Sequence, residues 1–433
     1  MANTYDTYKD SGVAWIGKIP NEWKIVRQKN IFSLTKILVE ESWETTPLLS
    51  LTTKGIKCID IGTTSGKVPD SYNTYQIVKP GDLVMCLFDL DCSAVFSGLS
   101  KTYGMISPAY KVLKVNEEYD PLYYSYWFDY IFDGRKFMYL SKNIRYSLTY
   151  DEFASLNIPN PSYAEQKTIA SFLDKKCVEI DSLIALQDEM ISELQAYKQS
   201  VITETVTKGL DSNAKMKNSG VEWIGEIPEG WDVKPFKYIF KTGKGLSFTK
   251  ADLVNEGVPV ISYGQVHSKQ NKGTQIVDSL IRFVPVEMNS PLAKVHIGDF
   301  IFADTSEDLE GCGNCVYIDK EIGLYAGYHS VIAHAQSKSS NLYLAYLFLT
   351  NCWRSQIRSR VSGIKVLSIS QSIINQTTVI LPHLSEQRAI TSYLDEKTAQ
   401  IDALISLKQE KIAELKNYKK SIIYEYVTGK KRV

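Results

Sequence analysis

The sequence predicts an α+β protein with an internal duplication. We expect two modules with twisted, mixed or antiparallel sheets, separated by two long helices that form an antiparallel intramolecular coiled coil. Three observations predict this fold: two framing segments each occur twice, a long helical segment follows each module, and the module interiors alternate short apolar runs with turns. Two copies related in this way would be arranged with pseudo-two-fold symmetry.

The duplication is visible in both framing segments. Residues 9–23 read K-D-S-G-V-A-W-I-G-K-I-P-N-E-W, and residues 217–231 read K-N-S-G-V-E-W-I-G-E-I-P-E-G-W, an offset of 219 − 11 = 208 between the matching serines. Residues 165–207 align without a gap on residues 386–428, at an offset of 386 − 165 = 221, with 23 of 43 positions identical. The interiors between these frames diverge, which favours two modules with one architecture and two different targets.

The second framing segment is predicted to be a long helix. It contains no Pro or Gly, and Gly209 follows its first copy as a C-terminal cap residue. Its apolar residues recur at alternating steps of three and four, which predicts a coiled-coil seam widened by Leu183 and Leu404. The seam residues are Ile180, Ile184, Ile191, Leu194 and Val201 in the first copy, and Ile401, Ile405, Ile412, Leu415 and Ile422 in the second.

These patterns predict four consecutive segments: a first module at 1–163, a first helix at 164–210, a second module at 211–385 and a second helix at 386–433. Each helix needs an apolar partner stripe, and the other copy can supply it. At about 1.5 Å per residue, 43 residues make a rod of roughly 65 Å. Core helices of one large α-rich domain, or an oligomerisation stalk, remain alternatives at this stage.

The module interiors indicate short strands and one late helix each. Residues 75–86 form an apolar strand, a Pro-Gly turn and a second strand, and residues 109–115 and 257–262 also have strand patterns. Aromatic, helix-like stretches follow at 122–132 and 342–353. Each module is therefore expected to hold a twisted, largely antiparallel sheet with a helix.

Basic residues follow each aromatic stretch, and they are the main candidates for DNA contact. Lysine and arginine contact phosphates, and arginine also recognises guanine edges. The candidates are Arg135, Lys136, Lys142, Asn143 and Arg145 in the first module, and Arg354, Arg358, Arg360 and Lys365 in the second. Further candidates in polar, turn-rich segments are Lys54, Lys57, Tyr263, Gln265, His267 and Lys269. The alternative for each is an ordinary solvated surface.

Composition excludes several other classes. Lys+Arg and Asp+Glu both number 49, so a positive surface must be local or supplied by partners. No apolar run approaches the roughly 18–20 residues of a membrane helix, and seven scattered cysteines favour a reducing cytoplasm. Cys312 and Cys315 form a single C-x-x-C, whereas zinc would need a second pair. Without a P-loop or nucleophile motif, we expect no catalytic and no metal-binding residues.

The framing motifs resemble a known family. S-G-V-x-W-I-G-x-I-P-x-x-W at 11–23 and 219–231, with Ile/Leu-Pro…Glu-Gln-x-x-Ile-x-x-x-Leu-Asp at 158–174 and 381–395, is similar to the DNA-specificity (S) subunits of type I restriction-modification systems. The resemblance covers essentially the whole chain. It implies a non-catalytic subunit whose two target-recognition domains bind the halves of a bipartite, asymmetric DNA sequence, with a spacer set by the helices.

The resemblance also implies partners. It implies two methyltransferase subunits, which methylate adenine and bind S-adenosylmethionine, and endonuclease/translocase subunits that use ATP and Mg, with no cofactor on this chain. A coiled-coil scaffold that binds protein partners is the alternative from a different class. A fused methyltransferase-specificity protein is disfavoured, because the sequence lacks a cofactor-binding motif.

Overall fold

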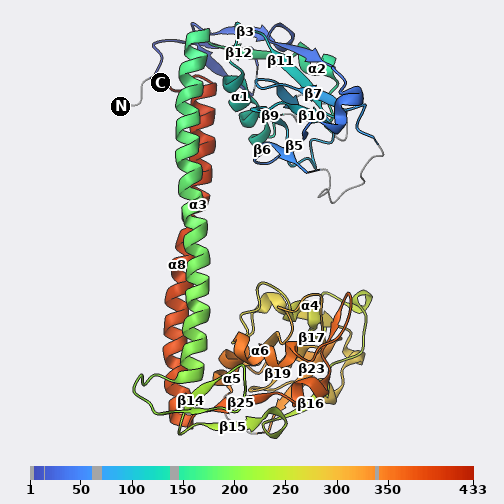
Figure 1. Ribbon diagram of the computed structural model, residues 1–433, viewed down its shortest axis with the longest axis vertical. Coiled ribbons are helices and arrows are strands. Elements are labelled where there is room, and N and C mark those ends of the chain that lie inside the picture. The colour runs from blue at the N-terminus through green and yellow to red at the C-terminus, as the bar shows by residue number, and fades with distance from the viewer. Residues whose placement is uncertain (1–3, 14, 61–70, 137–145, 337–340) are drawn as a thin grey trace. The chain divides into compact units, whose positions relative to one another are not determined.

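The structure is a computed structural model that describes residues 4–13, 15–60, 71–136, 146–336 and 341–433 (Figure 1). The chain packs as two units. Unit 1 comprises Met1–Asp188 with Gln409–Val433, and unit 2 comprises Glu189–Lys408. Each unit contains one sheet module, the beginning of one long helix and the end of the other.

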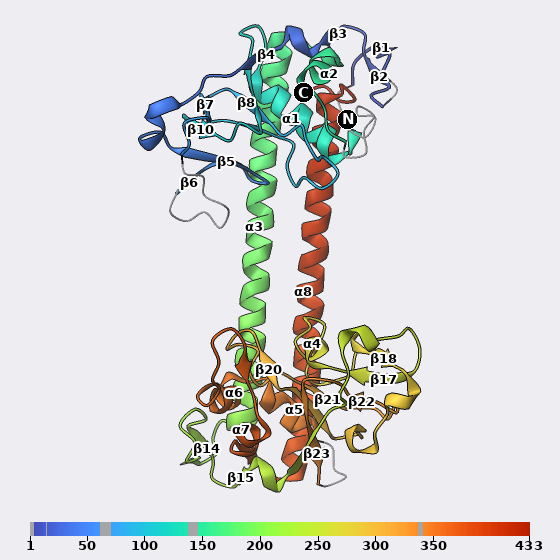
Figure 2. The same cartoon turned by 90° about the vertical axis from the view of Figure 1, so that its right-hand side faces the viewer.

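Two long helices run through both units. α3 (Tyr163–Lys208) has 46 residues and α8 (Leu384–Val427) has 44, close to the lengths predicted from the duplicated segments. Within each unit they lie side by side, in green and red (Figures 1 and 2). α3 is followed by Gly209, whose φ of 77° is the left-handed conformation that glycine adopts readily after a helix.

Two equivalent ion pairs define the register of the helices. In unit 1 the Lys419 ammonium lies 2.7 Å from both carboxylate oxygens of Asp181, and in unit 2 Lys198 lies 2.7 Å from both oxygens of Asp402. These are copies of one contact, because 402 − 181 and 419 − 198 both equal 221. Along α3, Asp181 comes before Lys198. Along α8, the partner of Lys198 comes first and the partner of Asp181 comes second, so the two helices run in opposite directions. The predicted antiparallel coiled coil is therefore confirmed.

The predicted seam residues are withdrawn from solvent to different degrees. Ile180, Ile401, Ile412 and Ile422 are buried. The remaining seam residues are partly buried: Ile184, Ile191, Leu194, Val201, Ile405 and Leu415. Leu183 and Leu404 are each 48% exposed, so the predicted widening of the seam is wrong. They lie one position before the seam residues Ile184 and Ile405.

The larger sheet has the same strand order in both units. It is β4-β11-β8-β9 in unit 1 and β16-β23-β19-β21 in unit 2, antiparallel throughout. The strands of unit 1 are β4 (Phe32–Thr35), β8 (Leu83–Met85), β9 (Ser97–Leu99) and β11 (Lys111–Val115). Those of unit 2 are β16 (Phe240–Lys244), β19 (Phe300–Ala303), β21 (Cys315–Tyr317) and β23 (Ser330–Ala335).

A second, smaller sheet in each unit contains one parallel pair. Its order is β6-β5-β10-β7 in unit 1, with β10 parallel to β5, and β18-β17-β22 in unit 2, with β22 parallel to β17. The bounds are β5 (Leu48–Thr52), β6 (Gly55–Ile59), β7 (Gln76–Val78), β10 (Gly104–Ile106), β17 (Val258–Ile261), β18 (Arg282–Val284) and β22 (Tyr325–Ala326). Each module is thus a pair of sheets, where the sequence suggested one. β7 and β8, separated by the predicted Pro-Gly turn, belong to different sheets.

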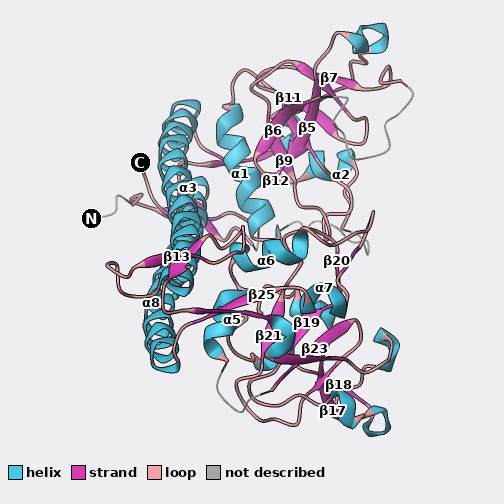
Figure 3. Ribbon diagram, turned by 60° about the horizontal axis from the view of Figure 1, so that its bottom comes forward, coloured by secondary structure: helices cyan, strands magenta, loops and turns pink. Residues whose placement is uncertain are grey.

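Alternating side chains of the central strands separate two apolar layers. In unit 1, Leu83 packs in the core that includes the aromatic helix, and Val84 packs in the core against the second sheet. In unit 2, Phe300 and Ile301 divide in the same way. Because successive strand residues point to opposite faces, each module is layered as helix, sheet and second sheet (Figure 3).

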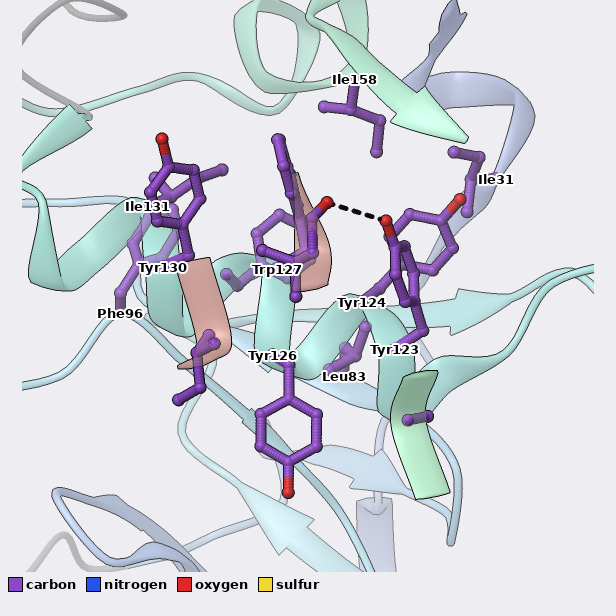
Figure 4. Close-up of a cluster of buried hydrophobic side chains, with 14 of the residues drawn as sticks. Ile31, Leu83, Phe96, Tyr123, Tyr124, Tyr126, Trp127, Tyr130, Ile131 and Ile158 are labelled. Atoms are coloured by element: carbon purple, nitrogen blue, oxygen red, sulfur yellow. Dashed lines mark hydrogen bonds between the residues drawn. The ribbon is translucent and has the colours of Figure 1, made fainter. Parts of the chain in front are cut away.

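The aromatic residues predicted to be helical fill the core of unit 1. In α1 (Pro121–Asp133), Tyr123, Tyr124, Trp127 and Phe128 have 0% exposure. Figure 4 shows rings of α1 together with aliphatic side chains of the same core, among them Ile31, Leu83, Ile131 and Ile158. Asp120 begins the helix by accepting a hydrogen bond from the Tyr123 backbone N–H at 2.9 Å.

The corresponding stretch of unit 2 is two helices, so the prediction of one continuous helix is wrong. α5 (Leu342–Phe348) ends before Leu349, and α6 (Asn351–Arg358) begins after Thr350. The buried Thr350 hydroxyl accepts a hydrogen bond from the Trp353 backbone N–H at 3.4 Å. A threonine in this N-cap role starts a new helix.

Tyrosines of these helices anchor each module to the long helices in the same way. Tyr123 donates its hydroxyl to the Val427 carbonyl at 3.1 Å, and Tyr343 donates to the Val206 carbonyl at 2.8 Å. A second tyrosine in each unit donates to an aspartate of the other long helix: Tyr126 to Asp174 at 3.3 Å and Tyr346 to Asp395 at 2.6 Å. Each module therefore contacts the start of its own following helix and the end of the other.

Two-stranded pairings complete the frame, and the first four of them form two matching sets. β1 (Tyr8–Asp10) pairs with β2 (Lys18–Pro20), β3 (Lys24–Arg27) with β12 (Asn157–Asn160), β13 (Met216–Asn218) with β14 (Glu226–Pro228), β15 (Asp232–Pro235) with β25 (Thr378–Leu381), and β20 (Thr305–Ser306) with β24 (Leu367–Ser368). The remaining α-helices are α2 (Tyr150–Ser155), α4 (Tyr263–Val266) and α7 (Gln371–Asn375). The first and third pairings of this set are the two copies of the predicted module entrance.

Candidate nucleic-acid interface

In unit 2 the structure brings two sets of predicted residues to the same short strand. His267, just after α4, has its Nε2 atom 2.8 Å from the Thr305 carbonyl oxygen of β20. On its other side β20 pairs with β24, where Ser306 faces Leu367. β24 follows the basic segment that begins in α6. The candidates near 263–269 and those at 354–365 therefore flank β20, although about 90 residues separate them in the sequence.

The side chains of the first set differ in their freedom to contact a ligand. Gln265 is used locally, because its side-chain oxygen accepts a hydrogen bond from the Ser262 backbone N–H at 3.2 Å. His267 has partners at both ring nitrogens, with its Nδ1 3.2 Å from the Asn314 amide. Lys269 is exposed. The lysine is thus better placed than the glutamine or the histidine to reach a bound duplex.

Tyr263 belongs to a half-exposed aromatic group that the sequence did not single out. Its ring centroid lies 5.5 Å from those of Tyr328 and His329, and Phe248 lies 4.9 Å from Tyr328. His329 has a left-handed φ of 52°, and its Nδ1 is 3.2 Å from a carboxylate oxygen of Asp304. A strained backbone at a bulky polar residue is a feature of functional surfaces. The segments are far apart in sequence, so no local pattern could reveal the group.

The arginines of α6 also have unequal roles. The half-buried Arg354 donates Nε–H to the Phe348 carbonyl at 2.7 Å, and burial lowers the pKa of its guanidinium. Arg358 donates to Asn351 and to the Glu310 carbonyl at 3.0 and 2.9 Å. These contacts fix the turn between α5 and α6 and join it to the loop after β20.

Arg360 and Lys365 lie beyond α6 and are exposed. Arg360 donates one guanidinium N–H to the Gln356 carbonyl, and the rest of the group remains available. Both side chains belong to the loop between α6 and β24. Of the four basic candidates in this region, these two are the most accessible to a polyanion.

A basic groove lies along β16, and sequence reasoning missed it. It has a volume of about 680 Å³ and its lining includes Lys241, Lys244, Lys294, His296 and His334. The His334 Nδ1 is 2.9 Å from the buried Asp299 carboxylate, which also accepts the His296 backbone N–H at 3.0 Å. The only local signal for this groove was the pair of lysines at 241 and 244, in the pattern Lys-x-x-Lys at the end of β16. Lys294 reaches the groove from a distant segment, which no local pattern predicts.

In unit 1 the first candidates occupy a place equivalent to α4. Lys54 lies in the tight turn between β5 and β6, and Lys57 lies on β6; both are exposed. In unit 2 the residues that follow β17, the counterpart of β5, form α4. The same position of the fold thus carries a lysine hairpin in one unit and a short aromatic helix in the other.

The second set of unit 1 is described only in part. Arg135 follows α1, is exposed, and has a left-handed φ of 48°. Lys136 is half-buried. Lys142, Asn143 and Arg145 lie outside the described residues.

The C-x-x-C of unit 2 is buried. Burial raises the pKa of the Cys315 thiol to about 12 and also raises that of Cys312. Both side chains are packed in the core beneath α5, where a neutral thiol acts as a small apolar group. Within the described ranges, no three His, Cys, Asp or Glu side chains are grouped to hold a metal ion.

Two modules with one strand order, anchored to an antiparallel helix pair and differing in their exposed loops, define a duplicated recognition protein. Residues 228–417 match the family model described as the type I restriction modification DNA specificity domain. Among the described residues, no helix has the length and apolar character that a membrane span requires.

Several specificity subunits are similar in sequence. The type I restriction enzyme MjaVIII specificity subunit of Methanocaldococcus jannaschii is 27% identical over 286 residues, which are 65% of this chain and 63% of that protein. The putative MjaX specificity subunit of the same organism is 25% identical over 450 aligned positions and 96% of each chain. The EcoKI specificity subunit of Escherichia coli K12 is 20% identical over 48% of this chain and 44% of its own length.

Solved structures share the fold. A chain from a structure of complex assembly and conformational transition in the type I R-M system superposes with a TM-score of 0.69 at 15% identity, covering 94% of this chain and 98% of that one. The HsdS subunit of Thermoanaerobacter tengcongensis gives a TM-score of 0.50 at 15% identity, covering 95% and 98%. The family model over residues 228–417, the sequence relatives and the shared fold make this chain similar to the DNA-specificity subunits of type I restriction-modification systems.

Proposed function

We propose that this chain recognises a bipartite, asymmetric DNA sequence and directs methyltransferase and endonuclease subunits to it. Each module binds one half-site, and the helix pair sets a spacer that the modules do not contact. The observation that supports this most directly is that the two modules share one strand order in the larger sheet but expose different side chains. After equivalent strands, unit 1 presents Lys54 and unit 2 presents Tyr263. Different surfaces select different bases, so the two halves of the target differ in sequence.

Direct contacts would come from the accessible side chains of each unit. Arg360, Lys365 and Lys269 in unit 2, and Lys57 and Arg135 in unit 1, are exposed cations that can contact phosphates or guanine edges. The formal net charge of the chain is +0, so its long-range attraction for DNA is weak. Partner subunits would therefore supply much of the positive field around the duplex.

Repeated apolar side chains on the long helices support assembly with two copies of one partner. Leu186 and Leu407 are 48% and 60% exposed, and they lie 221 positions apart. Tyr197 and Tyr418, at the same offset, are 57% and 55% exposed. Two equivalent surfaces on one pseudo-symmetric chain suit two methyltransferase subunits.

The chemistry would reside on those partners. We assign S-adenosylmethionine and adenine methylation to the methyltransferase subunits, and ATP, Mg and DNA cleavage to the endonuclease/translocase subunits. This chain would bind no cofactor of its own and act in the cytoplasm with them. Its contribution is the choice of sequence.

The test is DNA binding by the purified chain, alone and with its methyltransferase subunit, against a randomised pool of duplexes. We expect one bipartite sequence to be enriched by the complex, with an affinity that falls as salt rises. Exchange of residues 219–382 for the equivalent module of a relative should change one half-site only. Enrichment of no sequence under either condition would refute the proposal and favour a scaffold that binds proteins.

A further inference from the structure

The loop between α6 and β24 exposes an apolar side chain at its tip. Ile364 has a relative exposure of 102%, the highest among the large hydrophobic residues of the described chain. It is therefore as accessible as in an extended peptide and has no packing role in unit 2. Single exposed apolar residues are common on protein surfaces, so exposure alone assigns no function. The backbone geometry of the loop and the charges around its tip are what point to a function.

The loop holds its tip outward. At its base Ser362 pairs with Ser368, whose N–H donates to the Ser362 carbonyl at 3.1 Å, and β24 is itself paired with β20. Gly363 has a φ of 149°, and a Cβ atom there would lie 2.0 Å from the Val366 carbonyl oxygen. Only glycine fits this turn without displacing the backbone. The turn thus presents Ile364 from a paired base.

The charge around this tip suits a polyanion. Residues 322–385 contain no Asp or Glu, whereas Arg360 and Lys365 lie within four positions of Ile364 and are exposed. In the part of the chain that the structure describes, neither forms an ion pair with a carboxylate. Both cations are available to DNA phosphates.

The loop after β20, beside β24, carries the opposite charge. Glu307, Asp308 and Glu310 are exposed there. Carboxylates repel phosphates but accept hydrogen bonds from the cytosine amino group in the major groove. In a DNA groove, base edges lie between two phosphate backbones. The two cations can contact the phosphates, while the acidic loop and the apolar tip can contact the base edges.

We propose that Ile364 is an apolar base contact of the second recognition module, with Arg360 and Lys365 on the flanking phosphates. The proposal rests on the proposed function and specifies one element of its recognition surface. DNA offers two apolar surfaces to such a tip: the thymine methyl group at a groove edge, and the face of a base exposed when a step is opened. The first copy has Asn143-Ile144-Arg145, 220 positions before Gly363-Ile364-Lys365, although those residues lie outside the described ranges.

The experiment compares Ile364→Ala with a matched control, Val286→Ala, which truncates another exposed side chain of unit 2 at 62% exposure. Each variant is assembled with the methyltransferase subunit and bound to the duplex that the wild-type complex selects from a randomised pool. Ile364→Ala should weaken this binding about tenfold or more, as loss of one base contact does. Binding to unrelated duplexes, the dependence on salt and the melting temperature should stay unchanged, and Val286→Ala should behave as wild type.

Two further measurements distinguish the two apolar surfaces of DNA. Replacement of single thymines by uracil should weaken wild-type binding at one position and leave Ile364→Ala unaffected, if the tip contacts a methyl group. A 2-aminopurine probe in the second half-site should brighten with the wild type and not with Ile364→Ala, if the tip opens a base step. Either result supports the apolar base contact.

Wild-type affinity of Ile364→Ala for the selected duplex would overturn this inference while leaving the proposed function intact. Weaker assembly with the methyltransferase subunit, at unchanged DNA specificity, would also overturn it and make the tip a protein contact. Failure of the wild-type complex to select any sequence would overturn the proposed function itself, and this inference with it.

Discussion

Lengthening the two long helices together should lengthen the spacer of the DNA target. The change is a tandem duplication of residues 183–189 in α3 and of residues 404–410 in α8, which are equivalent segments 221 positions apart. Seven residues turn a helix by about 700°, within about 20° of two full turns, so the seam stays on one side. At about 1.5 Å per residue, each helix grows by about 10.5 Å.

This increment corresponds to about three base pairs of B-DNA, at about 3.4 Å for each. The assay is sequencing of the methylated sites in a host that carries the altered complex, which reports both half-sites and the spacer. We expect unchanged half-sites and a spacer longer by about three base pairs. An unchanged spacer in an assembled, active complex would refute the idea that the helices set the distance.

Duplication in α3 alone is the matched control. In the parent chain 17 residues separate the ion-pair positions on each helix (198 − 181 and 419 − 402). After the single duplication, 24 residues separate these positions on α3 and 17 on α8, so only one of the two ion pairs can form. One module then contacts a displaced end of the long helix. The single duplication should therefore melt at a lower temperature than the paired one.

Three smaller predictions concern stability and DNA affinity. Leu394→Ala, at a fully buried position of unit 2, should lower the free energy of unfolding by about 2–5 kcal/mol in chemical denaturation. Lys198→Ala should cost no more than about 1 kcal/mol, because Lys198 and Asp402 are partly exposed, and high salt should remove the difference between the melting curves. The double variant Lys241→Ala, Lys244→Ala should weaken binding of selected and unrelated duplexes equally, and titrations at several salt concentrations should give a log-log slope shallower by about two. A sequence-dependent loss would instead place these lysines at base edges.

The sequence predicted the helices and the framing segments well, because those features are local and repeated. A seam of alternating three- and four-residue steps and a glycine stop are enough to define a long helix, and the structure has α3 at Tyr163–Lys208. The break at Thr350 was not predicted, although Thr350 and Asn351 are poor helix formers that favour N-cap positions. The burial of the Thr350 hydroxyl that caps α6 depends on the tertiary contacts of unit 2.

The candidate residues show where pattern alone is insufficient. Arg354, Arg358 and Gln265 were selected by type and spacing, yet each has a partner within the protein. Lys294 and His329 reach the exposed surface of unit 2 from segments distant in sequence from the residues that they join there. Side-chain accessibility is a property of the packed module, since it depends on neighbours far apart in the chain.

The sequence by itself determined that the chain is a duplication, that each copy ends in a long helix with an apolar seam, and that its modules have unlike interiors. Those conclusions depend on periodicity and identity, which need no three-dimensional neighbours. Only the tertiary structure decided that both modules share one strand order and that Asp181 and Asp402 fix the helix register. It also decided that Ile364 is held outward while Arg354 and Arg358 are held by carbonyl groups of the module. The physical reason is that strand pairing, ion pairs and burial join residues distant in sequence.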